Sequence, residues 1–376
     1  MRLPRRALLL ATAVVATVLA APSPAATPPG YRVTANRIVD RAGHTVVLRG
    51  VNRAGTEGGA DTSGVAATDA EIGWYGHDRS GSWHATAVRV LVGSAQWTGS
   101  CPKLATDRGA YIRMIDAEVR SITKRRMVAL VDLHTSTAGC TSIGRHAMPD
   151  GPISEVFWSS VARHYAGNPL VAFELYNEPY WVSEDVWRNG TQYATFQDCD
   201  PSQSGLAAMA CKANAPRYRA VGMQALVNLV ARTAPGHLIV VDGLNFATVP
   251  PVRPLTGPVV YGLHPYTCAR PGSCQTRTNA HANLEVLNRW VPLSKRAPVW
   301  VTEFGWPSRT TLREVDGSGF YSETIDFLEK QKPAWGWMAF AFDGGNSGAF
   351  ELTTSTQTYA PNSTGMPVFR GLRRFS

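Results

Sequence analysis

Short runs of apolar, mostly β-branched residues recur along the chain and are separated by longer, more polar segments. Eight runs have the length of buried strands, and they span residues 46–51, 87–92, 127–133, 171–176, 238–241, 259–263, 299–302 and 335–342. Runs that are apolar on both faces are typical of a parallel sheet covered by helices. The pattern therefore predicts eight parallel strands.

Several of the intervening segments carry apolar residues at helical spacing. One segment places four of them on a single helical face, namely Tyr111, Ile115, Val119 and Ile122. A second segment, which Pro235–Gly236 ends, does the same with Tyr218, Val221, Ala225 and Leu229. Eightfold alternation of strand and helix predicts an α/β fold, the (β/α)8 TIM barrel. Because no linker-like segment divides the chain after Gly30, we expect a single domain.

Residues 1–26 have the pattern of a secretory signal peptide. Arg2, Arg5 and Arg6 precede an apolar run over residues 7–21, and small residues follow before Thr27. A membrane-spanning helix needs about 20 apolar residues, and no later stretch reaches that length without charges, Gly or Pro. We therefore expect a secreted protein with no membrane partner after the signal is removed, its domain formed by residues 27–376.

The chain is basic, with a formal net charge of +9 that falls to +6 when the signal takes away three arginines and no acidic residue. The nearest approaches to basic patches are Arg125–Arg126 and Arg373–Arg374, and neither pair is interleaved with aromatic residues as in a nucleic-acid platform. We expect no nucleic-acid partner.

Six cysteines follow the signal segment, at positions 101, 140, 199, 211, 268 and 274. An even number in an exported chain favours three disulfides over metal ligation. Proximity in sequence pairs Cys199 with Cys211 and Cys268 with Cys274, which leaves Cys101 with Cys140 in the loops after the second and third strands. Other pairings stay open, because six cysteines allow 15 of them.

Two glutamates close apolar runs and suggest cleavage of a glycosidic bond. Glu178 lies in Tyr-Asn-Glu-Pro, and Glu303 lies in Val-Thr-Glu-Phe-Gly. This chemistry needs a protonated acid for the leaving oxygen and an ionised carboxylate facing the anomeric carbon, and both can be Glu when their surroundings separate their pKa values. The two residues are therefore the predicted catalytic pair.

Further polar and aromatic residues directly follow predicted strands: Asn52, His134, Asn177, His264 and Tyr266. In a (β/α)8 barrel, the loops after the carboxyl ends of the strands meet on one face, where the active site lies. We therefore expect these segments to converge with Glu178 and Glu303.

In this combination the chain resembles glycoside hydrolase family 5, the cellulase-like (β/α)8 enzymes, from about residue 48 to residue 342. The order of family motifs is matched by Arg89, His134, Asn177–Glu178, His264-Pro-Tyr266, Glu303 and Trp337. Leu-Arg-Gly-Val-Asn at residues 48–52 is also similar to the first strand of that family. The resemblance implies a retaining glycoside hydrolase without a cofactor or metal, with Glu178 as acid/base and Glu303 as nucleophile.

The residue chemistry agrees with these roles. A guanidinium such as that of Arg89 and a phenol hydrogen bond from Tyr266 would favour the ionised form of Glu303. His264 would tune the proton exchange of the acid/base residue.

Seven residues are assigned to substrate binding: Asn52, Arg89, His134, Asn177, His264, Tyr266 and Trp337. Asn177 would hydrogen-bond the sugar 2-hydroxyl, a contact that strengthens in the transition state. Trp337 would form the floor of the cleavage subsite by stacking. Five more tryptophans in or near rim loops have flat faces for sugar rings: Trp74, Trp97, Trp181, Trp187 and Trp306.

Two other interpretations concern neighbouring residues. Glu174 lies four residues before Glu178, and the even spacing places both on one side of the strand, so we expect Glu174 to have a buried structural role. Asp132 and His134 with His264 suit a divalent ion, but no His-x-His or second carboxylate completes a hydrolytic metal set.

The expected substrate is a polysaccharide or oligosaccharide cut by a monomeric, endo-acting enzyme. A β-1,4-glucan is preferred, with β-1,4-mannan or another β-glycoside as the alternative, because specificity lies in the loops rather than in the fold. A carbohydrate-binding protein on an inactive barrel is disfavoured by the intact pair of glutamates.

Overall fold

A computed structural model of the chain describes residues 30–57, 67–100, 107–136, 146–191, 196–197, 217–266, 281–306, 317–342, 350–354 and 358–375, with Gly205 and Met209. All six cysteines and residues 1–26 lie outside these ranges. The predicted disulfides and signal peptide therefore stay predictions. No helix within the ranges is long and apolar enough to cross a membrane.

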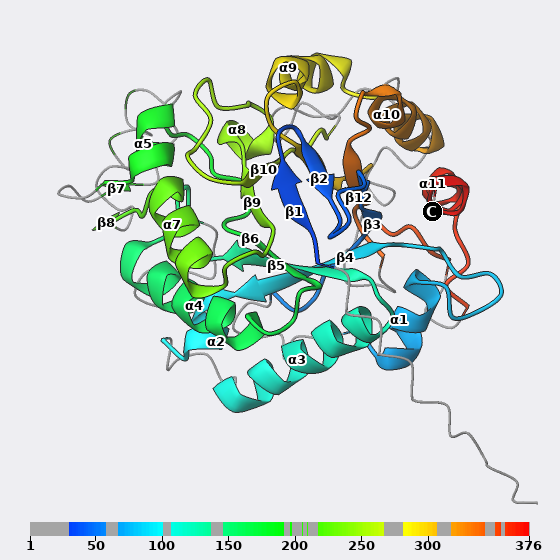
Figure 1. Cartoon of the computed structure of the whole chain (residues 1–376), viewed down its shortest axis with the longest axis horizontal. Coiled ribbons are helices and arrows are strands. Elements are labelled where there is room, and N and C mark those ends of the chain that lie inside the picture. Colours follow the sequence, from blue (N-terminus) through cyan, green and yellow to red (C-terminus); the bar gives the residue numbers. More distant parts are fainter. Residues whose placement is uncertain are drawn as a thin grey trace, which may run out of the picture.

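Eight parallel strands close into a barrel in the order β3-β4-β5-β6-β9-β10-β11-β12 (Figure 1). Their bounds are β3 Arg49–Arg53, β4 Ala87–Gly93, β5 Val128–Thr135, β6 Val171–Glu174, β9 Ile239–Asp242, β10 Val259–Gly262, β11 Val299–Phe304 and β12 Gly336–Ala339. Each overlaps one of the predicted apolar runs. The (β/α)8 barrel is confirmed.

Helices surround the barrel and cover the outward faces of its strands (Figure 1). They are α1 Asp69–Tyr75, α2 Ser94–Thr98, α3 Arg108–Lys124, α4 Gly151–Tyr165, α5 Glu184–Asn189, α7 Met223–Thr233, α8 Leu244–Ala247, α9 Leu284–Ser294, α10 Ser318–Lys330 and α11 Met366–Phe375. Side chains of Asp107, Asp150 and Asn283 cap the starts of α3, α4 and α9 by accepting first-turn N–H groups, which explains where these helices begin.

The predicted apolar face of α3 is confirmed, since all four of its residues are buried. For α7 the prediction was wrong, because the buried face consists of Met223, Leu226, Val227 and Val230. Residues 217–222 are extended instead: β8 (Arg217–Tyr218) pairs with β7 (Phe196–Gln197), and Val221 bridges to Gly190. A Cβ on Gly222 would lie 2.4 Å from the carbonyl oxygen of Arg188, so this close backbone contact fixes the start of α7.

Alternate residues of each strand enter either the barrel interior or the layer under the helices. On β11 this alternation is broken between Val301 and Phe304, where the register with β12 shifts. Both of those side chains pack in the outer layer. The irregularity therefore leaves Thr302 and Glu303, two consecutive residues, on the inner side, where both make the contacts described below.

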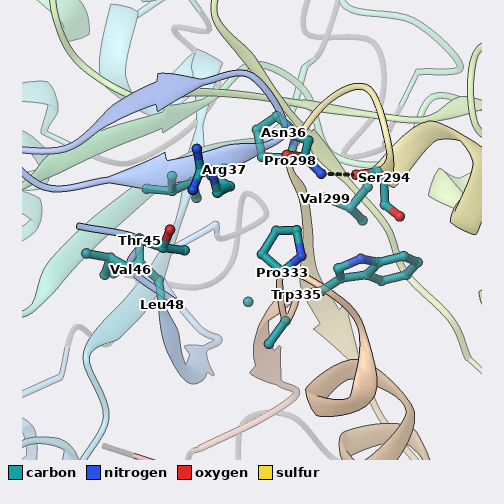
Figure 2. A pocket seen from close by; sticks show the side chains of 13 residues that line it. Asn36, Arg37, Thr45, Val46, Leu48, Ser294, Pro298, Val299, Pro333 and Trp335 are labelled. Atoms are coloured by element: carbon teal, nitrogen blue, oxygen red, sulfur yellow. Dashed lines mark hydrogen bonds between the residues drawn. The ribbon is translucent and has the colours of Figure 1, made fainter. Parts of the chain in front are cut away.

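A hairpin that the sequence did not predict, β1 (Arg32–Thr34) and β2 (Arg37–Val39), closes the amino-terminal end of the barrel (Figure 1). Ile38 packs with the apolar residues at the bottom of the barrel. Asn36 Nδ2 donates to the carbonyl oxygen of Ser294 at 3.0 Å beside a small pocket that Trp335 helps to line (Figure 2). This pocket lies at the starts of β11 and β12, opposite to the end that carries Glu303.

Candidate active site

The predicted site residues gather where the strands end. The structure brings eight of them to the carboxyl end of the barrel, namely Asn52, Arg89, His134, Asn177, Glu178, His264, Tyr266 and Glu303. They come from β3, β4, β5 and β11 and from the segments after β6 and β10. The ninth, Trp337, lies elsewhere.

The guanidinium of Arg89 lies at the centre of this group and is fully buried. Its Nη1 donates to Glu303 Oε2 at 2.7 Å and to Asn52 Oδ1 at 3.0 Å, and its Nη2 donates to Asn177 Oδ1 at 3.0 Å. Burial opposes its charge, but the carboxylates of Asp132 and other acids raise the pKa of Arg89 well above its usual value. A permanent positive charge therefore lies beside Glu303.

Glu303 receives a second donor on its other oxygen, because the Tyr266 hydroxyl donates to Oε1. Burial, and then the nearby Glu303 carboxylate, raise the pKa of Tyr266 well above its usual value, so the phenol keeps the proton that it donates. Two donors directed at one carboxylate stabilise its ionised form. Both oxygens of Glu303 are therefore held by donors, as a nucleophilic carboxylate requires.

Glu178 is paired with His264, whose Nδ1 lies 2.8 Å from Glu178 Oε1. The other ring nitrogen, Nε2, lies 3.0 Å from Thr302 Oγ1. Burial opposes the charge of this imidazole, but the surrounding carboxyl groups, Asp242, Glu303 and Glu178, raise the pKa of His264 above its usual value. At neutral pH it is therefore an imidazolium, with one N–H directed at Glu178 and the other at the threonine.

The two glutamates face each other across a short gap. Ligand atoms of Glu178, His264 and Glu303 all lie within 4.8 Å of one another. Each glutamate is 7% exposed, so both reach the barrel mouth, whereas Arg89 and His264 are completely covered. The environments differ as well, since Glu303 is held by an arginine and a phenol, and Glu178 by an imidazole.

His134 and Asn177 offer polar groups to a ligand. His134 is partly exposed, and its Nδ1 lies 2.7 Å from Asp132 Oδ2, which fixes the ring. Asn177 is fully buried, and its Nδ2 has no hydrogen-bond partner within the described part of the chain. Because Arg89 already occupies Oδ1, the free N–H groups of this amide are oriented for a ligand oxygen.

The prediction that Trp337 forms the floor of the cleavage subsite is wrong. Its ring is fully buried, Nε1 donates to Glu329 Oε1 on α10 at 2.8 Å, and the ring edge faces Gly371 on α11. The inward-facing residue of β12 is Met338, so its neighbour must face the helices. Two residues beyond Met338, the half-buried Phe340 is the aromatic side chain on the inner side of this strand.

Beside Glu178, sequence reasoning found Trp181 but missed the two aromatic residues that pack with it, Tyr180 and Phe246. The rings of Tyr180 and Phe246 stack at 4.9 Å with an interplanar angle of 3°, and Trp181 meets Tyr180 edge-on at 4.9 Å. Phe246 N–H donates to the carbonyl oxygen of Pro179 at 2.9 Å, which joins the loop after β9 to the segment that carries Glu178.

Trp181 is the member of the predicted rim set that is exposed, at 37%. Trp97, Trp187 and Trp306 are buried, and Trp74 is half-buried. Three consecutive residues, 245–247, have φ between 50° and 60°. None of these three residues is a glycine, so the sequence carried no signal for this conformation.

The structure does not bring Asp132, His134 and His264 together as a possible metal site. Within the described ranges, the acidic and histidine groups close enough to share an ion are Glu174 with Asp242 and His264, and Glu178 with His264 and Glu303. Both sets depend on His264. Because its two nitrogens carry protons directed at Glu178 and Thr302, this imidazole presents no lone pair to a metal at neutral pH.

A closed (β/α)8 barrel with two close carboxylates at its mouth, one beside an arginine and one beside a histidine, defines a glycoside hydrolase. The Cellulase family, described as glycosyl hydrolase family 5, matches residues 56–344. The chain therefore belongs to glycosyl hydrolase family 5, as the predicted resemblance indicated.

Solved structures support the fold. The catalytic domain of an endoglucanase from Thermobifida fusca, in complex with cellotetraose, is 19% identical, with 92% of this chain and 97% of that chain covered and a TM-score of 0.59. A β-glucanase from Saccharophagus degradans is 16% identical, with 94% and 98% covered and a TM-score of 0.60. An endo-β-1,4-glucanase from Xanthomonas axonopodis pv. citri is 14% identical, with 88% and 100% covered and a TM-score of 0.62. No curated protein matches the chain in sequence.

Proposed function

We propose that the protein is a secreted, endo-acting β-glycosidase that hydrolyses a β-1,4-glucan with retention of anomeric configuration. The separation of Glu178 and Glu303 carries the proposal, because their facing carboxylate oxygens lie within 4.8 Å of each other. Retaining enzymes place the two carboxyl groups about 5–5.5 Å apart, whereas inverting enzymes need about 6.5–9.5 Å to admit a water molecule.

In the first step, Glu303 attacks the anomeric carbon while Glu178 gives its proton to the leaving glycosidic oxygen. The C–O bond to the leaving group breaks as the ester bond to Glu303 forms, so the sugar becomes an α-linked glycosyl enzyme. In the second step, Glu178 takes a proton from water, and the resulting nucleophile displaces Glu303. Two inversions give net retention.

Arg89 and Tyr266 support this division of labour because they stabilise Glu303 both as the ionised nucleophile and as the leaving carboxylate. The unpaired Nδ2 of Asn177 supports a contact to the sugar 2-hydroxyl, where hydrogen bonds strengthen in the oxocarbenium-like transition state. Each of these contacts acts on the glycosyl side of the bond.

The choice of a β-1,4-glucan rests on the names of the similar solved structures, which include endoglucanases and a complex with cellotetraose. The exposed face of Trp181 beside Glu178 suits stacking of a sugar ring on the leaving-group side. An open aromatic surface on that side favours a chain that continues past the cleaved bond, which is endo action.

A panel of purified polysaccharides with sizing of the products tests the substrate. We expect cellulose-type β-1,4-glucans to be cut into mixed oligosaccharides. Preferential cleavage of β-mannan would show that the substrate is a mannan and would leave the two-glutamate mechanism unchanged. Proton NMR of the first product, before mutarotation, tests the stereochemistry: a β-anomer is expected, and an α-anomer would rule out the covalent mechanism.

Substitution separates the two roles. Glu303→Ala should lower kcat by about 10⁴-fold or more on every substrate, because no nucleophile remains. Glu178→Ala should spare the first step for aryl glycosides with good leaving groups, and azide should restore turnover with a glycosyl azide product. Glu285→Ala, on an exposed face of α9, is the matched control and should keep full activity. Ordinary activity in Glu303→Ala would show that the nucleophile is another residue.

A further inference from the structure

Asp242, the last residue of β9, lies fully buried next to the acid/base residue. Its Oδ2 accepts the backbone N–H of Glu178 at 2.9 Å. Glu178 has a φ of 50°, a left-handed conformation. Such a conformation costs a non-glycine residue on the order of 1–3 kcal/mol and persists only where neighbours hold it. Asp242 is therefore one of the groups that hold the backbone beneath the acid/base carboxyl.

The same carboxyl lies close to that of Glu174, and Asp242 Oδ1 and Glu174 Oε1 are buried with no other hydrogen-bond donor within the described residues. Two ionised carboxylates are acceptors only, so these oxygens can bind each other only if they share a proton. Glu174 is held in its ionised form by Nε of Arg89, with a further hydrogen bond from Thr302. Burial raises the pKa of Asp242 well above its usual value. The shared proton therefore belongs to Asp242.

These contacts close a ring of hydrogen bonds. Beginning at the Glu178 side chain, the ring passes through His264, Thr302, Glu174 and Asp242 and returns to the Glu178 backbone. The direction of each donor follows from its neighbour: His264 donates to the threonine oxygen, whose hydroxyl must then donate to Glu174. The ring thus fixes both ends of the acid/base residue.

We infer that Asp242 is a positioning residue for the acid/base Glu178: as a neutral acid it donates to Glu174 and accepts the Glu178 N–H, and so sets the position of Glu178 and the orientation of His264. The inference deepens the proposed function and rests on the acid/base role given there to Glu178. Asp242 itself does not touch the substrate in this scheme.

The neighbouring strand β10 leaves space for the Asp242 carboxyl group. Gly262 on β10 pairs in register with Asp242 on β9. A Cβ at position 262 would lie 1.9 Å from Asp242 Oδ1, so a larger residue there would displace the acid. The sequence pair of Asp242 and Gly262 is therefore one structural unit.

The charge state of Asp242 matters because other ionisable groups surround it. They are Arg89 on β4, Asp132 on β5, Glu174 and Glu178 at and after β6, His264 after β10 and Glu303 on β11. An ionised Asp242 would make the largest contribution to the raised pKa of His264. With Asp242 neutral, the positive charge of His264 is held by Glu303 and Glu178 instead.

Two substitutions test the inference through kinetics. Asp242→Asn keeps an acceptor for the Glu178 N–H and a donor for Glu174, so kcat should stay within about threefold of wild type with the same pH profile. Asp242→Leu removes both contacts, so kcat should fall by about tenfold or more with little change in KM, and the limbs of the pH profile should move. Equal inactivation of both folded variants, or a Leu variant with wild-type kcat and pH profile, would overturn the inference.

Infrared difference spectroscopy tests it without any substrate. The spectrum of wild type minus Asp242→Asn at pH 7 should contain the C=O band of a protonated carboxylic acid. Glu118→Gln is the control, because burial raises the pKa of Glu118 to about 8 and its loss should remove a separate band. Absence of the Asp242 band would overturn the inference whatever the activity. Presence of the band in a protein that cleaves no β-glycan would instead reject the proposed function and leave the neutral acid standing.

Discussion

Glu118 is a buried carboxyl group that the proposed mechanism does not use. It lies on the inner face of α3, and both of its oxygens are buried. Burial raises the pKa of Glu118 to about 8, although the charge of Arg53 acts against this. The folded protein therefore holds this acid mainly in its neutral form below that pH.

Glu118→Gln should stabilise the protein in alkaline buffer and leave it unchanged in acid. The folded pKa of about 8 exceeds the unfolded pKa of about 4.3, so wild-type stability is highest below the lower value and falls as pH rises toward the upper one. The variant lacks this loss, which is on the order of a few kcal/mol. Thermal unfolding at pH 5 and pH 8.5 measures it, and an equal Tm difference at both pH values would contradict the assignment.

Tyr266→Phe removes one of the two donors to Glu303 and keeps the ring. We expect kcat to fall by about 10- to 100-fold, because a hydrogen bond to a charged group is lost at the reacting carboxylate. The Tm should change little. Tyr165→Phe is the matched control, since its hydroxyl binds Asp116 on α3, away from the barrel mouth, and it should leave kcat unchanged.

At the residue scale, the sequence revealed those site residues that directly follow an apolar run, because polar groups at the carboxyl ends of parallel strands must meet. Asp242 also directly follows an apolar run, Ile-Val-Val, but was overlooked because a polar residue at the end of a strand is common. Its significance depends on Gly262 and Glu174, which lie on the two neighbouring strands. A contact between strands is not visible in either strand alone.

At the scale of elements, β12 shows how a motif can identify the right strand and the wrong residue. The Gly-Trp motif led to Trp337, but the alternation of side chains places that ring under the helices and leaves Phe340 on the inner side. The irregularity on β11 has the opposite effect, because it lets two consecutive residues face inward. The hairpin β1–β2 was missed because strands of three residues give too little periodicity to detect.

Trp337→Phe should therefore affect stability rather than catalysis. The substitution keeps an aromatic ring but makes it smaller and removes the hydrogen bond from Nε1 to Glu329. The largely buried carboxylate of Glu329 then has one donor fewer. We expect a loss of about 1–3 kcal/mol in the free energy of unfolding, with KM and kcat unchanged. Denaturant unfolding and steady-state kinetics check both parts. A large rise in KM would show that the Trp337 ring contacts the substrate.

At the scale of the whole molecule, the disulfide prediction awaits its test. We expect Cys101–Cys140, Cys199–Cys211 and Cys268–Cys274, and peptide mapping under non-reducing conditions should recover these three pairs. Six free thiols in protein secreted into an oxidising medium would refute the prediction of disulfides. Three bridges in another arrangement would refute only the pairing, which rests on proximity in sequence.

The hairpin that closes the bottom of the barrel also sets how the molecule can be attached to a support. Gly30, which leads into β1, is at that closed end, whereas Glu178 and Glu303 open toward the opposite face. A tether joined just ahead of Gly30 would therefore hold the mouth of the barrel away from the surface. Protein immobilised in this orientation should still cleave an insoluble fibre. Random coupling through lysines would instead leave the barrel mouth of some molecules against the support.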